Sequence, residues 1–182
     1  MIAFEIASHD LLVRELEPPD EAEVQALFAA CDDWFEAATG QPSMPGDVQS
    51  MYYAVPVGAD LAAKRILVVV RRGAIVGVVD AVLHHPRPDG CAVGAFLLHP
   101  DHRRQGVGTA LAGALLDRVR GHGVTTVSAG CAPGFEPGLG FLRALGFTVE
   151  TLAEWSEAVD RNRGPHEPVP LRATLDLGPP SE

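Results

Sequence analysis

The sequence predicts a single α/β domain in which helices cover both faces of a central β-sheet. The first observation is a set of near-continuous apolar runs at residues 66–70, 74–83 and 91–98, a pattern typical of strands buried on both faces. The second is an apolar stripe at helical spacing through residues 106–120, directly after a glycine-containing loop. The third is a length of 182 residues with 47% hydrophobic residues, which suits one domain with a sizeable core.

The other elements follow from turn residues and apolar spacing. We expect further strands at 11–16, 125–129, 147–152 and 169–177, further helices at 21–31, 47–53 and 139–145, and a polar irregular segment at 155–167. Residues 1–10 carry little pattern and form either an extra edge strand or a loose tail, and residues 178–182 are expected to be frayed. The expected order is therefore β-α-α-β-β-β-α-β-α-β-β, in one domain spanning residues 1–182.

Composition excludes several classes of protein. A formal net charge of −10 argues against nucleic acid as a partner, and no apolar run reaches the ~18 residues of a membrane span. The N-terminus has no basic segment followed by an apolar one, so we expect no signal peptide. Three widely spaced cysteines, Cys31, Cys91 and Cys131, favour a reducing compartment, and we predict a cytoplasmic location. The acidic balance suits a cationic substrate, although solubility alone explains it equally well.

The stretch from Cys91 to Leu111 reads as a strand, a turn, a loop and the start of a helix. Pro100-Asp101 ends the strand, and the loop that follows has the sequence Arg-Arg-Gln-Gly-Val-Gly-Thr over residues 103–109. A helix start presents backbone N–H groups without partners and a partial positive charge, and glycines let the backbone approach a ligand closely. Together with two arginines, these features predict a cradle for a phosphate group.

Two familiar phosphate motifs do not fit this loop. A P-loop requires Gly-Lys-Ser/Thr, which is missing, and the dinucleotide fingerprint requires a third glycine where Leu111 stands. The pattern Arg103-x-x-Gly106-x-Gly108, a few residues after a strand ending at His99-Pro100, instead resembles the acyl-CoA pyrophosphate loop of the GNAT superfamily of N-acetyltransferases. Leu145-Gly146-Phe147 resembles a second signature of that family, and the order of elements matches its fold along nearly the whole chain.

The resemblance implies a mixed sheet of about six to seven strands that splays between the fourth and fifth strands, where the pantetheine arm of acetyl-CoA lies. It implies an acetyl-CoA-dependent N-acetyltransferase without a metal, acting by direct attack of a primary amine of a small molecule or peptide. Backbone groups of Phe96 and Leu98 would contact pantetheine, and an N–H near Leu98 would polarise the thioester carbonyl. The implied cofactor-binding residues are Phe96, Leu97, Leu98, Arg103, Arg104, Gln105, Gly106, Val107, Gly108 and Thr109. Family members often form homodimers.

An amine with a pKa near ~10 must lose a proton before it attacks, so a base is needed. The main candidates are Asp80 and His99, and Asp32, Asp33 and Glu36 are the others. Asp80 lies in an apolar strand, where burial would raise the pKa of its carboxyl group, unless it sits at a strand edge facing solvent. His99 lies at the mouth of the expected opening, unless it is an ordinary turn residue before proline.

The acceptor site is expected at Asp32, Asp33, Trp34 and Phe35, because two acids beside two aromatics suit a cationic amine. The alternative for this segment is a solvated loop anchored by one aromatic side chain. Two positions depart from the family pattern: Leu142 stands where a tyrosine often protonates the leaving thiolate, and residues 134–136 lack the frequent asparagine. These departures favour a second hypothesis, a catalytically weak acyl-CoA-binding module for sensing or scaffolding. A nucleotide-binding protein unrelated to CoA is the third.

Overall fold

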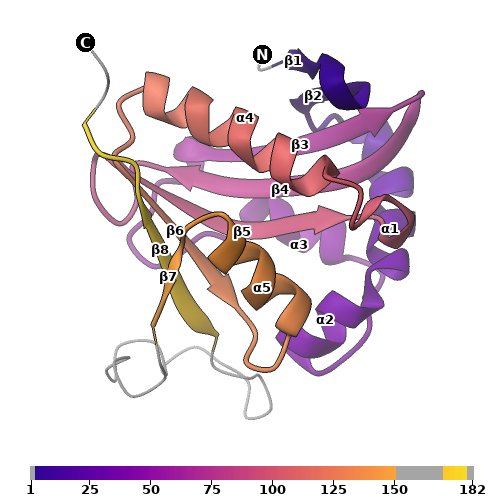
Figure 1. Ribbon diagram of the computed structural model, residues 1–182. Coiled ribbons are helices and arrows are strands. Elements are labelled where there is room, and N and C mark those ends of the chain that lie inside the picture. Colours follow the sequence, from indigo (N-terminus) through magenta and orange to yellow (C-terminus); the bar gives the residue numbers. More distant parts are fainter. Residues whose placement is uncertain (1–2, 151–169, 180–182) are drawn as a thin grey trace.

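A computed structural model describes residues 3–150 and 170–179, which form an eight-stranded mixed sheet (Figure 1). Its spatial order is β1-β2-β3-β4-β5-β6-β8-β7. The strands are β1 Ala3–Ile6, β2 Leu11–Glu15, β3 Lys64–Arg71, β4 Ala74–Leu83, β5 Gly90–Leu98, β6 Thr126–Cys131, β7 Thr148–Val149 and β8 Leu171–Asp176. Among these pairs, β5 and β6 run parallel and the others antiparallel. The count exceeds the expected six to seven because residues 3–6 form an edge strand, one of the two alternatives considered.

Helices cover both faces of this sheet, as predicted (Figure 1). The α-helices are α1 Glu21–Ala30, α2 Asp32–Thr39, α3 Asp47–Tyr53, α4 Val107–Gly121 and α5 Glu136–Ala144. On one face, α1 and α3 bury Phe28 and Val48 against Val78 of β4. On the other face, α4 buries Leu111 against strands β2 to β5. The predicted irregular segment at 155–167 lies outside the described residues.

The helix α2 is not among the predicted elements, since the sequence places no helical stripe over residues 32–39. Asp32 and Asp33 occupy its first turn, where negative charge is favourable next to the helix dipole. Gly40 ends it with a left-handed conformation at φ 81°, a common way of closing a helix. A bend at Cys31 separates α2 from α1, so the apolar spacing of α1 does not continue through it. Such a short helix depends on its ends and its contacts more than on periodicity.

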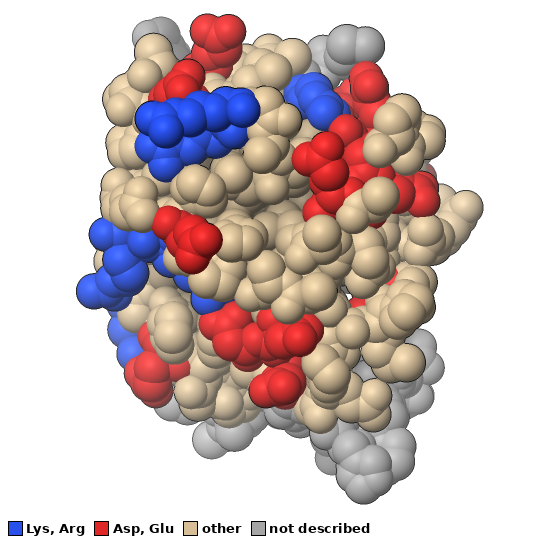
Figure 2. Space-filling model, turned by 90° about the vertical axis from the view of Figure 1, so that its right-hand side faces the viewer, with Lys and Arg blue, Asp and Glu red and all other residues tan. Residues whose placement is uncertain are grey.

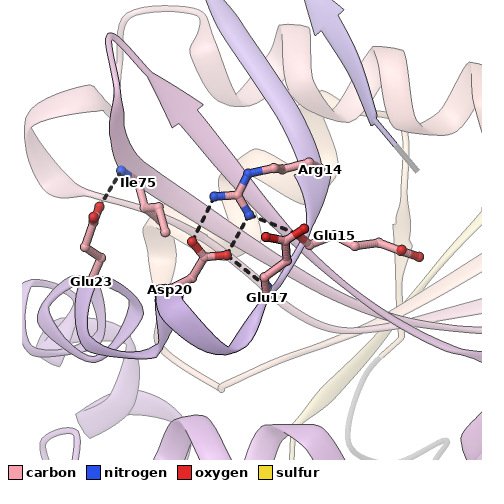
Figure 3. A network of polar contacts seen from close by, with 6 residues as sticks. All are labelled: Arg14, Glu15, Glu17, Asp20, Glu23 and Ile75. Atoms are coloured by element: carbon pink, nitrogen blue, oxygen red, sulfur yellow. Dashed lines mark hydrogen bonds and ion pairs between the residues drawn. The ribbon is translucent and has the colours of Figure 1, made fainter. Parts of the chain in front are cut away.

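The junction between β2 and α1 is fixed by a network of charged groups (Figure 3). The Arg14 guanidinium donates two hydrogen bonds to the Asp20 carboxylate, at 2.6 and 2.8 Å. The Glu17 N–H donates to the same carboxylate at 2.9 Å, and the Ile75 N–H donates to Glu23 at 3.2 Å. These contacts tie the start of α1 to strands β2 and β4, which sets the position of the helices behind the sheet.

Among residues 3–150 and 170–179, no helix combines the length and the apolar character that crossing a membrane requires.

Candidate active site

The sheet opens between β5 and β6, at the place expected from the sequence. The two strands pair from Gly90 to Val93 of β5, and in the described part of the chain their ladder ends there. At the same point the register between β4 and β5 shifts: Asp80 faces Ala95 while Ala81 faces Val93. Gly94 is therefore the extra residue of a β-bulge, which bends β5 away from β6. The opening beside residues 94–98 of β5 is called the wedge below.

Backbone polar groups of β5 face into the wedge. The His99 N–H donates to the Val76 carbonyl oxygen at 2.9 Å, so His99 directs its backbone groups toward β4. Because these directions alternate along an antiparallel strand, Phe96 and Leu98 direct theirs the opposite way, toward the wedge. The Leu98 carbonyl oxygen already accepts hydrogen bonds from Arg103 Nε at 2.8 Å and from Cys31 Sγ at 3.4 Å. The Leu98 N–H and both backbone groups of Phe96 face the wedge as well.

Residues 103–108, called the phosphate loop below, carry the conformation that an anion cradle needs. Arg104 and Gly106 adopt positive φ angles of 61° and 78°, which turn the chain sharply into α4. Within the described residues no side chain caps this end of α4, so its first backbone N–H groups point outward. A Cβ at Gly108 would lie 3.3 Å from both Leu98 and Phe141, so the first turn of α4 packs closely on β5 and α5.

The two arginines of the phosphate loop have different surroundings. Arg103 forms a two-pronged ion pair with Asp33 of α2, at 2.5 and 3.1 Å, and this hydrogen bonding lowers the pKa of the Asp33 carboxyl group. Arg104 is exposed. The Gln105 side chain donates to the Asp101 carbonyl oxygen at 2.7 Å and so braces the loop. The Arg103 side chain therefore joins α2 to the loop, and the predicted phosphate contacts rest mainly on backbone groups.

Asp80 is buried inside the sheet and is paired with a lysine that the sequence reasoning did not single out. Lys64 Nζ lies 2.8 and 2.9 Å from the two Asp80 carboxylate oxygens and 2.5 Å from the Ala54 carbonyl oxygen. Asp80 and Lys64 are 7% and 9% exposed. Burial raises the pKa of the Asp80 carboxyl group, and the hydrogen bond from Lys64 opposes that rise. Of the two environments considered for Asp80, the structure has the buried one.

The Asp80 carboxylate lies directly behind the bulge. A Cβ at Gly94 would come within 3.0 Å of Asp80 Oδ2, so the glycine leaves the carboxylate close to the wedge. Asp80 shares the sheet face of Val78, which packs against α1, α2 and α3. His99, the other candidate base, follows the end of β5, and its ring accepts a hydrogen bond from the Asp101 N–H at 3.3 Å. His99 lies beside the phosphate loop, about 16 Å along the chain from the bulge at the usual rise per residue.

The four expected acceptor-binding residues all lie on α2 but face different surroundings. Asp32 accepts a hydrogen bond from the Ser43 N–H at 2.9 Å, and Asp33 is paired with Arg103. Phe35 is 7% exposed and packs edge-on with Trp34, whose ring centroid is 5.0 Å away. Trp34 also lines the cavity described next. The role of all four in binding an acceptor stays a prediction.

An apolar cavity of about 460 Å³ opens from the wedge. Gly94, Ala95 and Phe96 of β5 line it together with Trp34 of α2. The Phe96 ring packs on Phe141 of α5 with ring centroids 5.3 Å apart, at the boundary between wedge and helix. From this end the cavity continues between α4 and the sheet. Its size and apolar lining are those of a small-molecule site.

Three further side chains along this cavity define which chemistry it supports. Leu142 of α5 lines it at the position where the family resemblance expects a tyrosine, and leucine has no proton to donate. Cys91 and Cys131 also line it, and burial raises the pKa of both thiols, that of Cys91 to about 11. Since the thiolate is the nucleophilic form, these neutral thiols are poor acyl acceptors. Among the residues described, no group of three His, Cys, Asp or Glu side chains is placed to hold a metal ion.

Charge is unevenly distributed around this end of the molecule. Figure 2 shows the face that includes α1 and α2, where acidic side chains form several separate groups and basic side chains lie beside some of them. The first turns of these helices contribute Glu21 and Glu23 in α1 and Asp32 and Asp33 in α2. The overall net charge of −10 adds to this local field, which favours the approach of a cation.

Comparison with known proteins gives one family. Residues 27–147 match the model of the acetyltransferase (GNAT) family. An acetyltransferase from Thermus thermophilus has a similar structure, with a TM-score of 0.68 and 18% identity over 92% of this chain and 97% of that chain. A ribosomal-protein-S18-alanine N-acetyltransferase from Escherichia coli has a TM-score of 0.61 and 16% identity, over 94% of this chain and 95% of that chain. The yncA protein of Salmonella typhimurium was solved with its cofactor acetyl-CoA. It has a TM-score of 0.63 and 18% identity, over 93% of this chain and 95% of that chain.

No curated protein matches the chain by sequence. The structural similarities, all at low identity, confirm the predicted fold.

Proposed function

Because this chain belongs to the acetyltransferase (GNAT) family, we propose that it transfers an acetyl group from acetyl-CoA to a primary amine of a small molecule or peptide. The observation that carries the proposal is the splay of β5 from β6 at the Gly94 bulge, directly before the phosphate loop and α4. This arrangement places an anion cradle and a strand edge side by side, which suits a diphosphate joined to an extended arm. The proposal that the acceptor is an amine is based on the acidic side chains around the site and on Asp80.

The residues present fit acetyl-CoA, which supplies an activated acyl group as a thioester. The outward-pointing N–H groups at the start of α4 would hold the pyrophosphate, with Arg104 adding positive charge. Phe96 and Leu98 would pair with the pantetheine arm through backbone groups that face the wedge, and one of these N–H groups would polarise the thioester carbonyl. At Gly108 there is no side chain between α4 and β5, so the backbone at the start of α4 would itself contact the pyrophosphate.

Asp80 is the proposed general base. It would accept a proton from the incoming ammonium group, directly or through one water, because it lies behind the bulge on the face that α2 and α3 cover. Burial raises the pKa of the Asp80 carboxyl group, and Lys64 opposes that rise and so favours the ionised state that a base needs. His99 is the second candidate, and its place beside the phosphate loop argues against it. The free amine then attacks the thioester carbon, a C–N bond forms, the C–S bond breaks and the CoA thiolate leaves. The nitrogen loses its second proton to water, and the thiolate takes up a proton from water.

Two observations bear on how well this chain catalyses the transfer. The neutral thiols of Cys91 and Cys131 favour direct attack by the amine over an acyl-cysteine intermediate. Leu142 favours the alternative function, an acyl-CoA-binding module without useful turnover, because it supplies no proton to the leaving thiolate. We place the protein in the cytoplasm, since its three free cysteines are all buried and suit a reducing compartment.

The test is a thiol-release assay with acetyl-CoA and a panel of amino acids, polyamines, aminoglycosides and peptides, run beside calorimetric titration with CoA. We expect CoA to bind and thiol to be released only when a suitable amine is added. The rate constant kcat/KM should fall as the pH is lowered through the pKa of Asp80, which lies above that of an ordinary carboxyl group. CoA binding without turnover of any amine in the panel would favour the acyl-CoA-binding module over the enzyme. The absence of any CoA binding to the folded protein would overturn both functions.

A further inference from the structure

The apolar cavity extends much further than an acetyl group requires. Under α4 its floor is formed by side chains of β4 and β5, which alternate toward this face, and its roof is formed by the inner side of the helix. The floor residues are Val79, Ala81, Leu83, Cys91 and Val93, and the roof residues are Ala112, Leu115, Leu116 and Val119. None of the described residues that line the cavity is an aspartate or a glutamate. The space is therefore a largely apolar channel between a helix and a sheet, open to the wedge, and its described lining includes the basic side chains of Arg65, Arg118 and His122.

The channel follows α4 and reaches the exposed side chains of Arg118 and His122 at its far end. Its lining runs along α4 from Ala112 to His122, which follows the helix directly, a distance of about 15 Å at the rise of an α-helix. At the far end the Arg118 guanidinium lies 3.8 Å from the centroid of the Phe4 ring, and both residues line the channel. The His122 ring is held by a 2.8 Å contact with the Arg118 carbonyl oxygen. Beyond the wedge, this leaves room for a chain of several methylene groups, and most of the side chains along it are apolar.

From this geometry we infer that the protein accepts acyl-CoA thioesters with a straight acyl chain longer than acetyl, and that the chain lies in the channel under α4. The inference rests on the proposed function, because it assumes that the thioester sits in the wedge beside the Gly94 bulge. A ligand that covers the apolar walls of this channel removes them from water, which strengthens its binding. A polymethylene chain attached to the thioester is thin and apolar, and it enters from the wedge end. Small side chains at Gly94, Ala112 and Ala129 keep the channel clear.

The reaction itself is unchanged by the longer chain. The amine nitrogen forms the bond to the acyl carbon, the C–S bond breaks, and the CoA thiolate leaves. The amine gives up a proton through Asp80 to solvent, and the thiolate takes one up from water. The channel therefore sets which acyl group is transferred, whereas the bulge and the phosphate loop hold the rest of the thioester.

Calorimetric titration of the full chain with CoA, acetyl-CoA, butyryl-CoA, hexanoyl-CoA and octanoyl-CoA tests the inference. Burying a methylene group strengthens binding by up to about fourfold, so octanoyl-CoA should bind more than about tenfold tighter than acetyl-CoA. Equal or weaker binding of octanoyl-CoA, with CoA and acetyl-CoA bound normally, would overturn this inference and leave the proposed function standing. Failure of all five compounds to bind would instead overturn the proposed function.

Two variants on α4 distinguish binding of the acyl chain in the channel from non-specific hydrophobic binding of octanoyl-CoA. Ala112→Leu fills the channel, whereas Ala114→Leu makes the same change at a position that does not line it. The readout is the ratio of the octanoyl-CoA to the acetyl-CoA dissociation constant. Ala112→Leu should remove most of the chain-length effect and Ala114→Leu should keep it; an unchanged ratio in Ala112→Leu contradicts the inference. Should Ala112→Leu fail to fold, Ala81→Ile narrows the same channel from the floor and carries the same expectation.

Discussion

The Lys64–Asp80 pair puts two opposite charges inside the sheet, where both side chains are buried. Desolvation disfavours both charges, and their mutual contact and the Ala54 carbonyl oxygen offset that cost. A buried ion pair stabilises the fold little by comparison with apolar side chains of similar size. Removing one partner is nevertheless strongly destabilising, because the other charge is left buried without a partner. Its place behind the bulge supports the proposal that Asp80 is the general base.

Double-mutant analysis of this pair tests that view. Asp80→Leu alone should lower the free energy of unfolding by about 3–5 kcal/mol, because it leaves a buried lysine charge without a partner, and Lys64→Met alone should do likewise. The double variant should recover most of the loss, because both charges are gone. Urea unfolding at pH 7 measures the stabilities. If Asp80 is the base, the double variant binds CoA normally and shows greatly reduced amine-dependent thiol release; wild-type turnover in it would remove Asp80 from the mechanism.

Asp20 gives a second residue-level prediction, with a pH dependence of known sign. Its hydrogen bonds with Arg14 lower the pKa of the Asp20 carboxyl group (Figure 3). A lowered pKa means that the stabilisation is present above the unfolded value of about 3.9 and is lost as the pH falls through the folded value. Asp20→Asn should therefore lower the free energy of unfolding by about 1–3 kcal/mol at pH 7 and by much less near the folded pKa.

The control for Asp20 is Asp117 on α4, which lies 3.6 Å from Arg120 with a side chain 80% exposed. Asp117→Asn should change stability by less than about 0.5 kcal/mol at either pH, as exposed ion pairs usually contribute little. Urea titrations at both pH values compare the two variants. Equal effects of the two substitutions, or an Asp20 effect that grows toward acid pH, would contradict the assignment of a lowered pKa.

At the scale of elements, the strand–loop–helix unit from β5 to α4 was predictable because its signals are contiguous. An apolar run, a proline, two glycines and an apolar stripe follow one another within 91–120, and each acts locally. The helix α2 was not predictable from periodicity, since it is short and bounded by a bend at Cys31. The surroundings of Arg103 were hidden for another reason: its partner Asp33 lies 70 positions earlier and reaches it only through the fold.

The contact between α2 and the phosphate loop predicts that the two neighbouring arginines behave differently. Arg103→Ala should lower the melting temperature as well as weaken CoA binding, because it removes the ion pair with Asp33 and the hydrogen bond to the Leu98 carbonyl oxygen. Arg104→Ala should weaken CoA binding modestly without a change in melting temperature, because the side chain is exposed. Thermal unfolding and calorimetric titration measure both. A stable Arg103→Ala variant would mean that α2 is held by other contacts.

At the scale of the whole molecule, the order of strands creates the site. The parallel pair β5–β6 lies inside an otherwise antiparallel sheet, and the bulge in β5 ends that pairing halfway along the strand. Element order is visible in the sequence, and so the family fold was predictable. The register that puts Lys64 beside Asp80, and the packing that leaves a channel under α4, depend on contacts between distant segments, so no local pattern indicates them.

The net charge of −10 would act with opposite signs on the two proposed substrates. The long-range field attracts a cationic amine and repels anionic CoA, and it is screened within about 10 Å at 0.1 M salt. In thiol-release assays with saturating acetyl-CoA, kcat/KM for a doubly charged amine should fall as sodium chloride is raised from ~0.02 to ~0.5 M, and more steeply than for a singly charged amine. The CoA dissociation constant should change less, because screening weakens the attraction at the phosphate loop and the repulsion by the rest of the molecule together. Identical salt dependence for the two amines would show that approach of the acceptor is governed by local contacts alone, and that the acidic surface serves another purpose.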